Sequence, residues 1–258
     1  MEFCLENVSK IYPAQAGNTH ALNTIHEVVR AGEFVVLVGP SGCGKSTLLK
    51  LAAGLERPTS GRLYWCGMQR TPRTAMVFQE GGLFPWLTVR ENVAVALEST
   101  ELSSGDKEKR ITERLAFMGL EEFADAYPET LSGGMRQRVG IARAWVTEPD
   151  LLLMDEPFSA LDAQTRRLME EELIRYREIF RPATLYVTHH IPEAVHLADR
   201  IWVFSHRPGE IIAHREISIP PAQRRQPEYR EEIAALEEDI WELIRTEADL
   251  RMRGNIEP

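Results

Sequence analysis

The 258-residue chain is 43% hydrophobic and contains 30 basic and 39 acidic residues, which gives a formal charge of −9. A chain of this length can bury a substantial core, as one large domain or as two unequal lobes. The acidic balance argues against a general electrostatic grip on nucleic acid or on anionic lipid. We therefore expect a globular protein that binds no nucleic acid and that contacts a membrane only through another protein.

The sequence predicts neither a transmembrane segment nor a secretory signal. No stretch approaches the roughly 20 consecutive apolar residues that cross a bilayer, and the first ten residues lack an apolar core. We expect the product to remain in the cytoplasm. Cys4, Cys43 and Cys66 form neither a disulfide framework nor a paired metal spacing, so reduced thiols are expected, with Cys43 as a small filler in a tight loop.

Apolar runs that favour strands alternate with helical patterns along the chain. This alternation is typical of a mainly parallel sheet covered by helices. Most of the runs are short and are followed by turn or polar residues, as in buried parallel strands that carry functional groups at their carboxyl ends. The predicted strands are Phe34–Val38, Thr74–Phe78, Leu151–Asp155, Thr184–Thr188 and Ile201–Ser205.

A glycine-rich loop connects the first of these strands to a helical pattern that ends near Gly54. In such a loop, main-chain amides converge on nucleotide phosphates. Lys45 supplies a positive charge for the β- and γ-phosphates, and the Ser46 hydroxyl suits a Mg²⁺ that binds phosphate oxygens. Taken alone, the loop is also compatible with an ordinary strand-to-helix turn. Its residues are Gly39, Pro40, Ser41, Gly42, Cys43, Gly44, Lys45, Ser46 and Thr47.

Helical patterns follow one another from about residue 81 to residue 149, with a polar break at Ser103–Asp106. We expect a separate helical lobe, inserted into the sheet domain. Within it, Ser132, Gly133 and Gly134 belong to the sequence LSGGM, which precedes a helix whose N-terminal dipole would favour a γ-phosphate. An ordinary N-cap with flexible glycines is the alternative interpretation of this segment alone.

Two adjacent acidic residues end the predicted strand that begins at Leu151. Adjacent strand residues point to opposite sides, so one carboxylate can serve a metal while the other faces the γ-phosphate. We assign Asp155 to the Mg²⁺ shell and Glu156 to general-base catalysis on the attacking water; two solvated strand-end acids are the alternative. After a predicted turn at Ser159–Asp162, His189 ends a later strand and could contact the γ-phosphate, although a lone histidine is more often structural.

A last helical pattern runs from Pro227 to Arg245. Its apolar residues fall at helical spacing, with glutamates on the other face. A helix packed on its own domain is the favoured interpretation, because a single apolar stripe needs only one surface to cover it; a regulatory or dimer-locking role is the alternative. The apolar residues are Ile233, Leu236, Ile240 and Leu243.

With these motifs in this order, the chain resembles the nucleotide-binding subunit of an ATP-binding cassette (ABC) transporter over about Met1–Gly209. The resemblance implies an α/β fold of the P-loop NTPase type, with a RecA-like, mainly parallel sheet that carries helices on both faces. It adds an antiparallel β subdomain and an inserted helical subdomain. The implied units are an ATP-binding core at residues 1–80 and 150–225, the helical subdomain at 81–149, and a C-terminal helical tail at 226–258.

The resemblance also implies ATP and Mg²⁺ as cofactors and a homodimer in the ATP-bound state. Two copies would sandwich two ATP molecules, each held by the glycine loop of one copy and by LSGGM of the other. Gln79, in the sequence VFQE, would sense Mg²⁺ and the attacking water while transmitting rotation of the helical lobe. The implied catalytic residues are Glu156, His189 and Gln79, and the implied metal ligands are Ser46, Gln79 and Asp155. Beyond the glycine loop, the residues implied to bind ATP are Tyr12, which would stack on adenine, Ser132, Gly133, Gly134 and Asp162.

Longer segments are similar to importer ATPases of the nitrate, sulfonate and taurine group, which also includes carriers of related small anions and of pyrimidines. The turn Arg207-Pro208-Gly209 is suggestive of this group, although it could simply join two strands. His190 and the pair Gly81-Gly82 depart from the residues usual there. The resemblance implies integral membrane permease subunits as partners and, indirectly, a periplasmic or extracellular solute-binding protein, with the chain on the cytoplasmic face of the membrane.

A loop-like apolar stretch follows Gly82, where glycine and proline break regular structure. We hypothesise that it lines a groove for a short helix of the permease, with burial in a hydrophobic core as the alternative. The ATPase of an exporter or of a lipid-transport complex is the alternative function. A non-transport cassette ATPase that acts on DNA or ribosomes is less favoured, because no coiled coil, zinc module or basic arm is visible. The apolar residues are Leu83, Phe84, Trp86 and Leu87.

Overall fold

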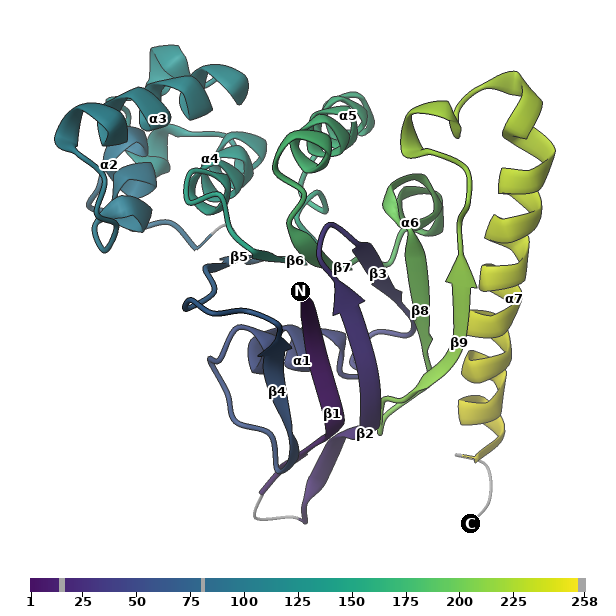
Figure 1. The fold of residues 1–258 in the computed structure, drawn as a ribbon. Coiled ribbons are helices and arrows are strands. Elements are labelled where there is room, and N and C mark those ends of the chain that lie inside the picture. The colour runs from purple at the N-terminus through teal and green to yellow at the C-terminus, as the bar shows by residue number, and fades with distance from the viewer. Residues whose placement is uncertain (14–16, 80–81, 255–258) are drawn as a thin grey trace.

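The chain folds around two β-sheets (Figure 1). The structure is a computed structural model that describes residues 1–13, 17–79 and 82–254. The expected boundary between residues 80 and 81, including Gly81 of the glycine pair, and the last four residues of the expected tail lie outside the described residues.

The larger sheet has six strands and is mainly parallel, as the sequence predicts. Its first five strands run parallel, and the last one pairs antiparallel with β8. In spatial order the strands are β5 (Thr74–Val77), β6 (Leu151–Asp155), β7 (Ala183–Val187), β3 (Phe34–Val38), β8 (Arg200–Phe204) and β9 (Ile211–Glu216).

Two of the predicted strands have the expected bounds, and three end one residue earlier than expected. Thr188 and Ser205 lie just beyond β7 and β8, where their hydroxyls bond to the following turns: Thr188 Oγ1 accepts from the His190 amide at 3.0 Å, and Ser205 Oγ donates to the His206 carbonyl at 2.8 Å. Phe78 also lies outside β5, and its carbonyl accepts a hydrogen bond from the Gln137 side chain.

A smaller antiparallel sheet confirms the antiparallel part of the expected fold. Its order is β2 (Thr19–Arg30), β1 (Glu2–Tyr12) and β4 (Ser60–Cys66). These strands were expected only from the resemblance, because many of their residues are exposed or half-buried and form no continuous apolar run. One face of the sheet packs into the core through residues that include Phe3, Leu5, Val8, Ile25 and Val29.

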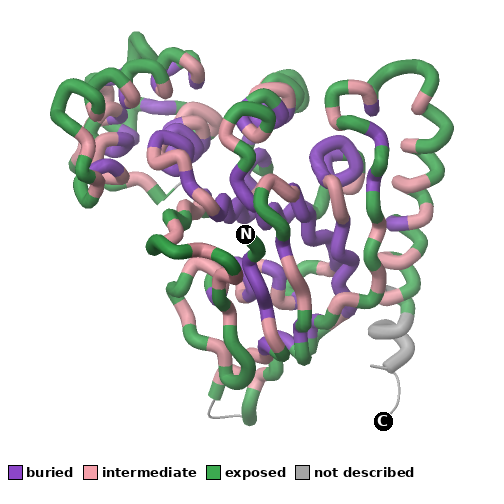
Figure 2. The backbone as a smooth tube through the Cα atoms, viewed as in Figure 1, coloured by how far each residue is buried: buried purple, intermediate pink, exposed green. Residues whose placement is uncertain are grey.

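The large sheet is covered on both faces, as alternate residues along β3 show. Val36 and Val38 pack into one hydrophobic cluster, whereas Val35 and Leu37 pack into the other. The first cluster contains residues of α4, α5 and α6, and the second contains residues of α1 and of the antiparallel sheet. Figure 1 shows these layers above and below the sheet, and Figure 2 shows that buried residues concentrate in the sheet and in α6.

The helices lie mostly where the sequence predicts them, and the polar break at Ser103 is the start of one. Ser103 Oγ accepts from the Asp106 amide at 3.1 Å, which caps this helix. The α-helices are α1 (Lys45–Ala52), α2 (Val89–Ala94), α3 (Ser104–Phe117), α4 (Gly133–Trp145), α5 (Ala163–Phe180), α6 (Ile191–Leu197) and α7 (Arg230–Gly254). The short 3₁₀ turns are η1 (Val95–Leu97), η2 (Glu121–Phe123), η3 (Pro128–Thr130), η4 (Pro221–Gln223) and η5 (Pro227–Tyr229).

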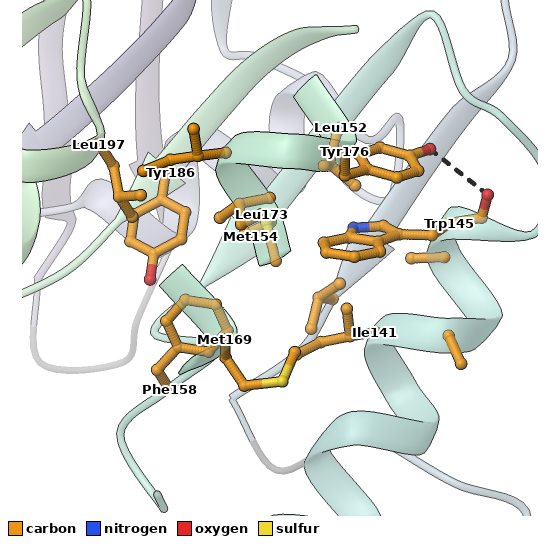
Figure 3. Packing of buried hydrophobic residues seen from close by; sticks show 14 of the residues in the cluster. Ile141, Trp145, Leu152, Met154, Phe158, Met169, Leu173, Tyr176, Tyr186 and Leu197 are labelled. Atoms are coloured by element: carbon orange, nitrogen blue, oxygen red, sulfur yellow. Dashed lines mark hydrogen bonds between the residues drawn. The ribbon is translucent and has the colours of Figure 1, made fainter. Parts of the chain in front are cut away.

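Aromatic packing joins α4 to α5 (Figure 3). The rings of Trp145 and Tyr176 stack with centroids 4.2 Å apart and an angle of 13° between their planes. The Tyr176 hydroxyl also donates to the Trp145 carbonyl at 3.4 Å. Both side chains are fully buried, so this contact fixes the C-terminal end of α4 against the helix that follows β6.

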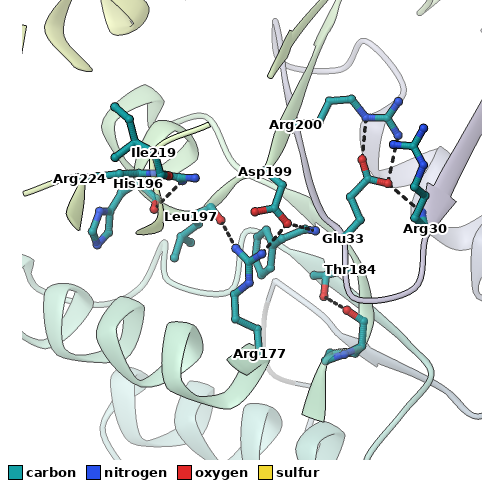
Figure 4. Close-up of polar contacts among 12 residues, drawn as sticks. Arg30, Glu33, Arg177, Thr184, His196, Leu197, Asp199, Arg200, Ile219 and Arg224 are labelled. Atoms are coloured by element: carbon teal, nitrogen blue, oxygen red, sulfur yellow. Dashed lines mark hydrogen bonds and ion pairs between the residues drawn. The ribbon is translucent and has the colours of Figure 1, made fainter. Parts of the chain in front are cut away.

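Ion pairs fasten the sheet at the edge where β3 and β8 begin (Figure 4). Asp199 Oδ2 accepts from the Phe34 amide at 2.9 Å and from Arg177 of α5 at 2.5 Å. Arg200 pairs with Glu33 at 2.9 Å. Because these charges lie at the beginning of the strands, the opposite edge, where the strands end, is left for other side chains.

The last helix, α7, packs on its own domain. Ile240 is fully buried, while Ile233, Leu236 and Leu243 are half-buried against the same cluster. Arg215 of β9 pairs with Asp239 at 2.5 Å. None of the helices in the described residues has the length and apolar content needed to cross a bilayer.

Candidate functional site

The glycine-rich loop lies where β3 ends and α1 begins. Gly44, at the N-cap of α1, has a φ of 115°, and a Cβ there would lie 2.6 Å from the Ala21 carbonyl oxygen. Only glycine satisfies both the backbone angle and this close approach to β2. The loop therefore presents its backbone, and the N-terminus of α1, to the space above it.

Lys45 is held against the loop that precedes it. Its Nζ donates to the carbonyls of Gly39 and Pro40, both at 2.8 Å, and lies 3.4 Å from the Cys43 sulfur. The side chain of Lys45 is 6% exposed, and Cys43 is buried, as expected of a loop filler. A buried ammonium with only neutral partners is well suited to gain an anionic one.

Ser46 and Asp155 meet across the site although 109 residues separate them. Ser46 Oγ donates to Asp155 Oδ1 at 2.9 Å. Asp155 is 8% exposed, and burial raises the pKa of its carboxyl, although the hydrogen bond from Ser46 opposes this effect. The pair presents a hydroxyl and a carboxylate oxygen, which are ligands that Mg²⁺ accepts.

Glu156 follows β6 and points into the same site, but its direction is not set by strand alternation as expected. The strand ends at Asp155, and Glu156 has a left-handed φ of 46°, so strand alternation does not separate the two carboxylates. The Glu156 amide donates to the Val187 carbonyl of β7 at 3.0 Å, which fixes this uncommon backbone conformation. As a result, Asp155 lies against Ser46 while Glu156 reaches other partners.

Those partners are Gln79 and His189. Gln79 Nε2 donates to Glu156 Oε2 at 3.2 Å, and His189 Nδ1 lies 3.1 Å from the same oxygen. The three side chains follow β5, β6 and β7, which are neighbours in the sheet. The adjacent His190 has a different place: its Nδ1 accepts from the Glu193 amide and caps α6.

A pocket of about 560 Å³ opens above the loop. It is lined by six residues of the loop, by two residues of β2 and by single residues from other segments of the chain. Residues expected at the site that line it are Tyr12, Ser41, Gly42, Gly44, Lys45, Ser46, Thr47, Gln79 and Glu156. Sequence reasoning missed Thr19, Ala21, Val187 and Arg207, which also line it.

Tyr12 borders this pocket at the end of β1. Its hydroxyl donates to Glu56 at 2.5 Å, and Lys10 Nζ lies 4.7 Å from the centre of its ring. Lys10 and Glu56 form an ion pair at 3.0 Å. These contacts hold the ring at the rim of the pocket. No sequence motif around Lys10 or Glu56 predicts that these two residues contact Tyr12.

Among the expected residues that do not line the pocket, two cap helices. Ser132 caps α4, where its Oγ accepts from the Met135 amide at 3.2 Å. Asp162 caps α5 and accepts from the Gln164 and Thr165 amides, both at 3.0 Å. Both residues are exposed, as is Gly133, whereas Gly134 is half-buried. Within one copy of the chain, these groups act as helix caps.

The apolar loop after Gly82 is exposed but well fixed. Trp86 is 70% exposed and Phe84 is 36% exposed, with ring centroids 5.6 Å apart, whereas Leu83 and Leu87 are half-buried. The buried Asn92 of α2 accepts from the Phe84 amide at 2.8 Å and donates to the Phe84, Leu87 and Thr88 carbonyls. The sequence pattern gave no indication of this role for Asn92.

The chain is similar to known proteins over most of its length. The family model described as "ABC transporter" matches residues 22–159. The chain is 45% identical over 228 residues to the bicarbonate transport ATP-binding protein of Synechococcus elongatus, covering 86% of this chain and 34% of that protein. It therefore spans about a third of that relative's length.

Other relatives are matched over almost their whole length. The chain is 42% identical to the nitrate import ATP-binding protein of Synechocystis sp., covering 92% of this chain and 95% of that protein. It is 41% identical to the aliphatic sulfonates import ATP-binding protein of Bacillus cereus, covering 90% of this chain and 93% of that protein.

A solved structure confirms the P-loop fold that the motifs predict. It is a dimeric, post-hydrolysis state of an ATP-binding cassette bound to ADP and phosphate. The likeness has a TM-score of 0.75 at 33% identity and covers 83% of this chain and 98% of that chain.

The buried charge of Asp155 leads to a first prediction. Because the pKa of Asp155 is raised in the folded protein, its ionised form costs stability at neutral pH, and this cost disappears as the pH falls through the raised pKa. Asp155→Asn should therefore increase the free energy of unfolding at neutral pH by about 1 kcal/mol, and the gain should shrink in acid. Urea unfolding of the protein without nucleotide or metal, at several pH values, measures both effects.

Asp150→Asn is the matched control. Although partial burial opposes the shift, bonds from Arg70 and Arg73 lower the pKa of Asp150. Its replacement should therefore decrease stability at neutral pH. If Asp155→Asn destabilised the protein as much as Asp150→Asn does, the Asp155 carboxylate would not be an unfavourable buried charge.

Proposed function

Since the chain belongs to the ABC transporter family, we propose that it is the ATP-hydrolysing subunit of an importer for a small solute. The observation that carries the proposal is that Lys45, Ser46 and Glu156 line one pocket, with Asp155 bonded to Ser46 beside it. The names of its relatives, which concern bicarbonate, nitrate and aliphatic sulfonates, support a small anion as the solute.

The glycine loop binds the phosphates of ATP in this proposal. The amides at the start of α1 point toward the pocket, where the helix dipole favours negative charge. Lys45 exchanges its loop carbonyl partners for oxygens of the β- and γ-phosphates. Tyr12, at the rim of the same pocket, is placed to stack on the adenine ring.

Residues next to the loop fit a Mg²⁺ ion. Ser46 and Asp155 already share a hydrogen bond of 2.9 Å, and Gln79 borders the same pocket, so three oxygen-bearing side chains are available. Bound there, Mg²⁺ would neutralise charge on the β- and γ-phosphate oxygens. The buried, anionic Asp155 would then gain a partner that offsets its desolvation.

Glu156 is the general base in the proposed reaction. Its carboxylate accepts the proton of the water that attacks the γ-phosphorus. Gln79 and His189 both contact Glu156 Oε2, so they orient this carboxylate and border the position of the attacking water. The side chain of Glu156 is 22% exposed, which leaves it open to the pocket.

The site is completed by a second copy of the chain in this proposal. Ser132, Gly133, Gly134 and Asp162 are expected to bind ATP, yet none lines the pocket of its own copy. A homodimer in the ATP-bound state would bring the N-terminus of one α4 to the γ-phosphate held by the other copy. A solved relative is dimeric and bound to ADP and phosphate, which supports this arrangement.

The segment after β5 would couple the site to the helical lobe. We propose a core of residues 1–80 and 150–225, a helical unit of residues 81–149 and a tail of residues 226–258. The α4 side chain of Gln137 donates to the Phe78 carbonyl at 3.3 Å, next to Gln79, and Arg143 of α4 donates to the Gly82 carbonyl at 2.9 Å. A movement of Gln79 would therefore be transmitted to α4 through these hydrogen bonds.

The exposed apolar loop would form the binding surface for the permease. Phe84 and Trp86 form an aromatic surface on a loop that Asn92 keeps in shape, and such a surface suits the apolar face of a short helix. The chain would thus lie peripherally on the cytoplasmic face of the membrane, held by integral permease subunits. A periplasmic or extracellular solute-binding protein would act on it only indirectly.

In the proposed cycle, ATP binding brings two subunits together into a closed dimer. The closed dimer shifts the permease to its outward-facing state, and ATP hydrolysis returns the complex to its starting state. Moving a two-state equilibrium from about 1:99 to 99:1 needs roughly 5.5 kcal/mol of differential binding, which two shared γ-phosphate sites are able to supply. ADP lacks the shared phosphate and should not close the pair.

Glu156→Gln should separate binding from turnover. The amide keeps the shape of the side chain but cannot accept the proton, so hydrolysis should fall by about 10²- to 10⁴-fold while ATP still binds and a dimer accumulates. Phosphate release and size-exclusion chromatography with ATP measure the two outcomes. Lys45→Ala is the contrasting variant and should weaken ATP binding itself by tenfold or more. A wild-type hydrolysis rate in Glu156→Gln would remove Glu156 from the role of base.

Ser132→Ala should reveal whether the site is shared. Wild-type ATPase activity per molecule should rise with protein concentration, because only the dimer hydrolyses ATP, and loss of the Ser132 hydroxyl should shift this dependence to about tenfold higher concentrations. Thr130→Ala, an exposed hydroxyl on the preceding turn, is the control. Activity that is independent of concentration and unaffected in Ser132→Ala would contradict a shared site.

Trp86→Asp should uncouple ATP hydrolysis from transport. A charge on the proposed docking surface should abolish the stimulation of ATPase activity by the permease complex, while the basal activity of the isolated subunit persists. Trp241→Asp changes another exposed tryptophan, on α7, and should leave the stimulation intact. Full stimulation of Trp86→Asp in the assembled complex would show that the permease docks elsewhere.

A further inference from the structure

The turn between β8 and β9 is tightly fixed next to β2 (Figure 1). Ser205 Oγ donates to the His206 carbonyl at 2.8 Å, with the Pro208 carbonyl 3.3 Å away, and accepts from the Glu210 amide at 3.0 Å. The His206 amide donates to Glu247 of α7 at 3.1 Å. The turn that carries Arg207 is therefore held from both sides.

Gly209 wedges this turn between β2 and the glycine loop. Its amide donates to the Ala21 carbonyl at 3.1 Å, and its carbonyl accepts from the Asn23 amide at 2.9 Å. A Cβ at Gly209 would lie only 2.0 Å from the Cys43 carbonyl oxygen, so any other residue would displace the loop. The sequence Arg207-Pro208-Gly209 thus does more than join two strands.

Arg207 extends from this turn to the loop itself. Its Nε and Nη2 donate to the Gly42 carbonyl at 3.1 and 2.9 Å, although 165 residues separate the two positions. Within the part of the chain that the structure describes, Arg207 Nη1 makes no hydrogen bond. The side chain is exposed and lines the same pocket as Lys45.

The charges that line the pocket show what Arg207 adds. Among its described lining residues, the charged side chains are Lys45, Arg207 and Glu156. A triphosphate carries several negative charges, and a guanidinium that has spare N–H groups is well suited to phosphate oxygens. Lys45 is almost fully buried, whereas Arg207 is open to an incoming nucleotide.

We propose that Arg207 is a further nucleotide-binding residue, which braces the glycine loop through Gly42 and offers its remaining N–H groups to the phosphates of the bound nucleotide. This inference rests on the proposed ATPase function. It assigns to the Arg207-Pro208-Gly209 turn a second positive charge at the site, supplied by the turn between β8 and β9 and not by the glycine loop itself.

Titration calorimetry of the full chain with ATP and Mg²⁺, at several salt concentrations, tests this role. Arg207→Ala should weaken binding by about 10- to 100-fold, because it removes a charged donor. It should also flatten the dependence of affinity on salt, since one cation fewer attracts the nucleotide. Arg207→Lys should keep the wild-type salt dependence but recover only part of the affinity, because one ammonium cannot both brace Gly42 and form a fork on phosphate.

Controls separate this inference from the function on which it rests. Arg230→Ala removes an exposed arginine outside the pocket and should bind like the wild type. Absence of ATP binding by the wild-type protein would refute the ATPase itself. Wild-type binding with an unchanged affinity in Arg207→Ala would overturn only the role of Arg207, and so would weaker binding with an unchanged salt dependence. Arg207→Gln provides the same test if the alanine variant does not fold.

Discussion

Strand β7 pairs in parallel with β6 on one side and with β3 on the other, so that Asp155, Val187 and Leu37 lie at the same level across the sheet. Because parallel strands end at the same edge, the glycine loop after β3, Glu156 after β6 and His189 after β7 emerge side by side. The Glu156 amide donates to the Val187 carbonyl, which extends this register one residue beyond the strand. A shift of one residue in this pairing would separate the groups of the site.

In the part of the chain that the structure describes, the site buries charged side chains without an opposite charge beside them, whereas charges elsewhere in the fold form ion pairs. Asp155 and Lys45 are both nearly inaccessible, and within the described residues neither forms a salt bridge; each bonds to neutral groups. Such buried charges cost stability, and a phosphate with its metal ion would offset that cost. Arg207 brings a further cation to the same pocket from the turn that follows β8. In our proposal, the cost of holding these charges in place is offset only when nucleotide is bound.

Hydrogen bonds also link the site to surfaces where partners are proposed to bind. Gln79 contacts Glu156, and the neighbouring Phe78 carbonyl accepts from Gln137 of α4. Helix α4 begins at Ser132, the residue proposed to meet ATP of a second copy, and its Arg143 bonds to Gly82 at the start of the exposed aromatic loop. One helix thus contacts the catalytic segment, the proposed dimer surface and the proposed permease surface.

The sequence alone determined the features that depend on neighbouring residues. The strand, glycine loop and helix at Phe34–Ala52 are contiguous, so apolar runs and turn chemistry suffice to predict them. The same holds for the apolar stripe of α7 around Ile240, whereas the segment at Ser103 was expected only as a polar break and proves to cap α3. The order of the motifs also indicated the ABC family.

Tertiary structure alone decided which distant groups meet. The pairing of Ser46 with Asp155, of Gln79 with Glu156 and of Gly42 with Arg207 joins positions that are 109, 77 and 165 residues apart. Strand order and register set these contacts, and neither follows from the spacing of residues along the chain. For the same reason, strand alternation failed to describe Glu156, whose direction depends on a backbone bond to β7 that only the folded sheet provides.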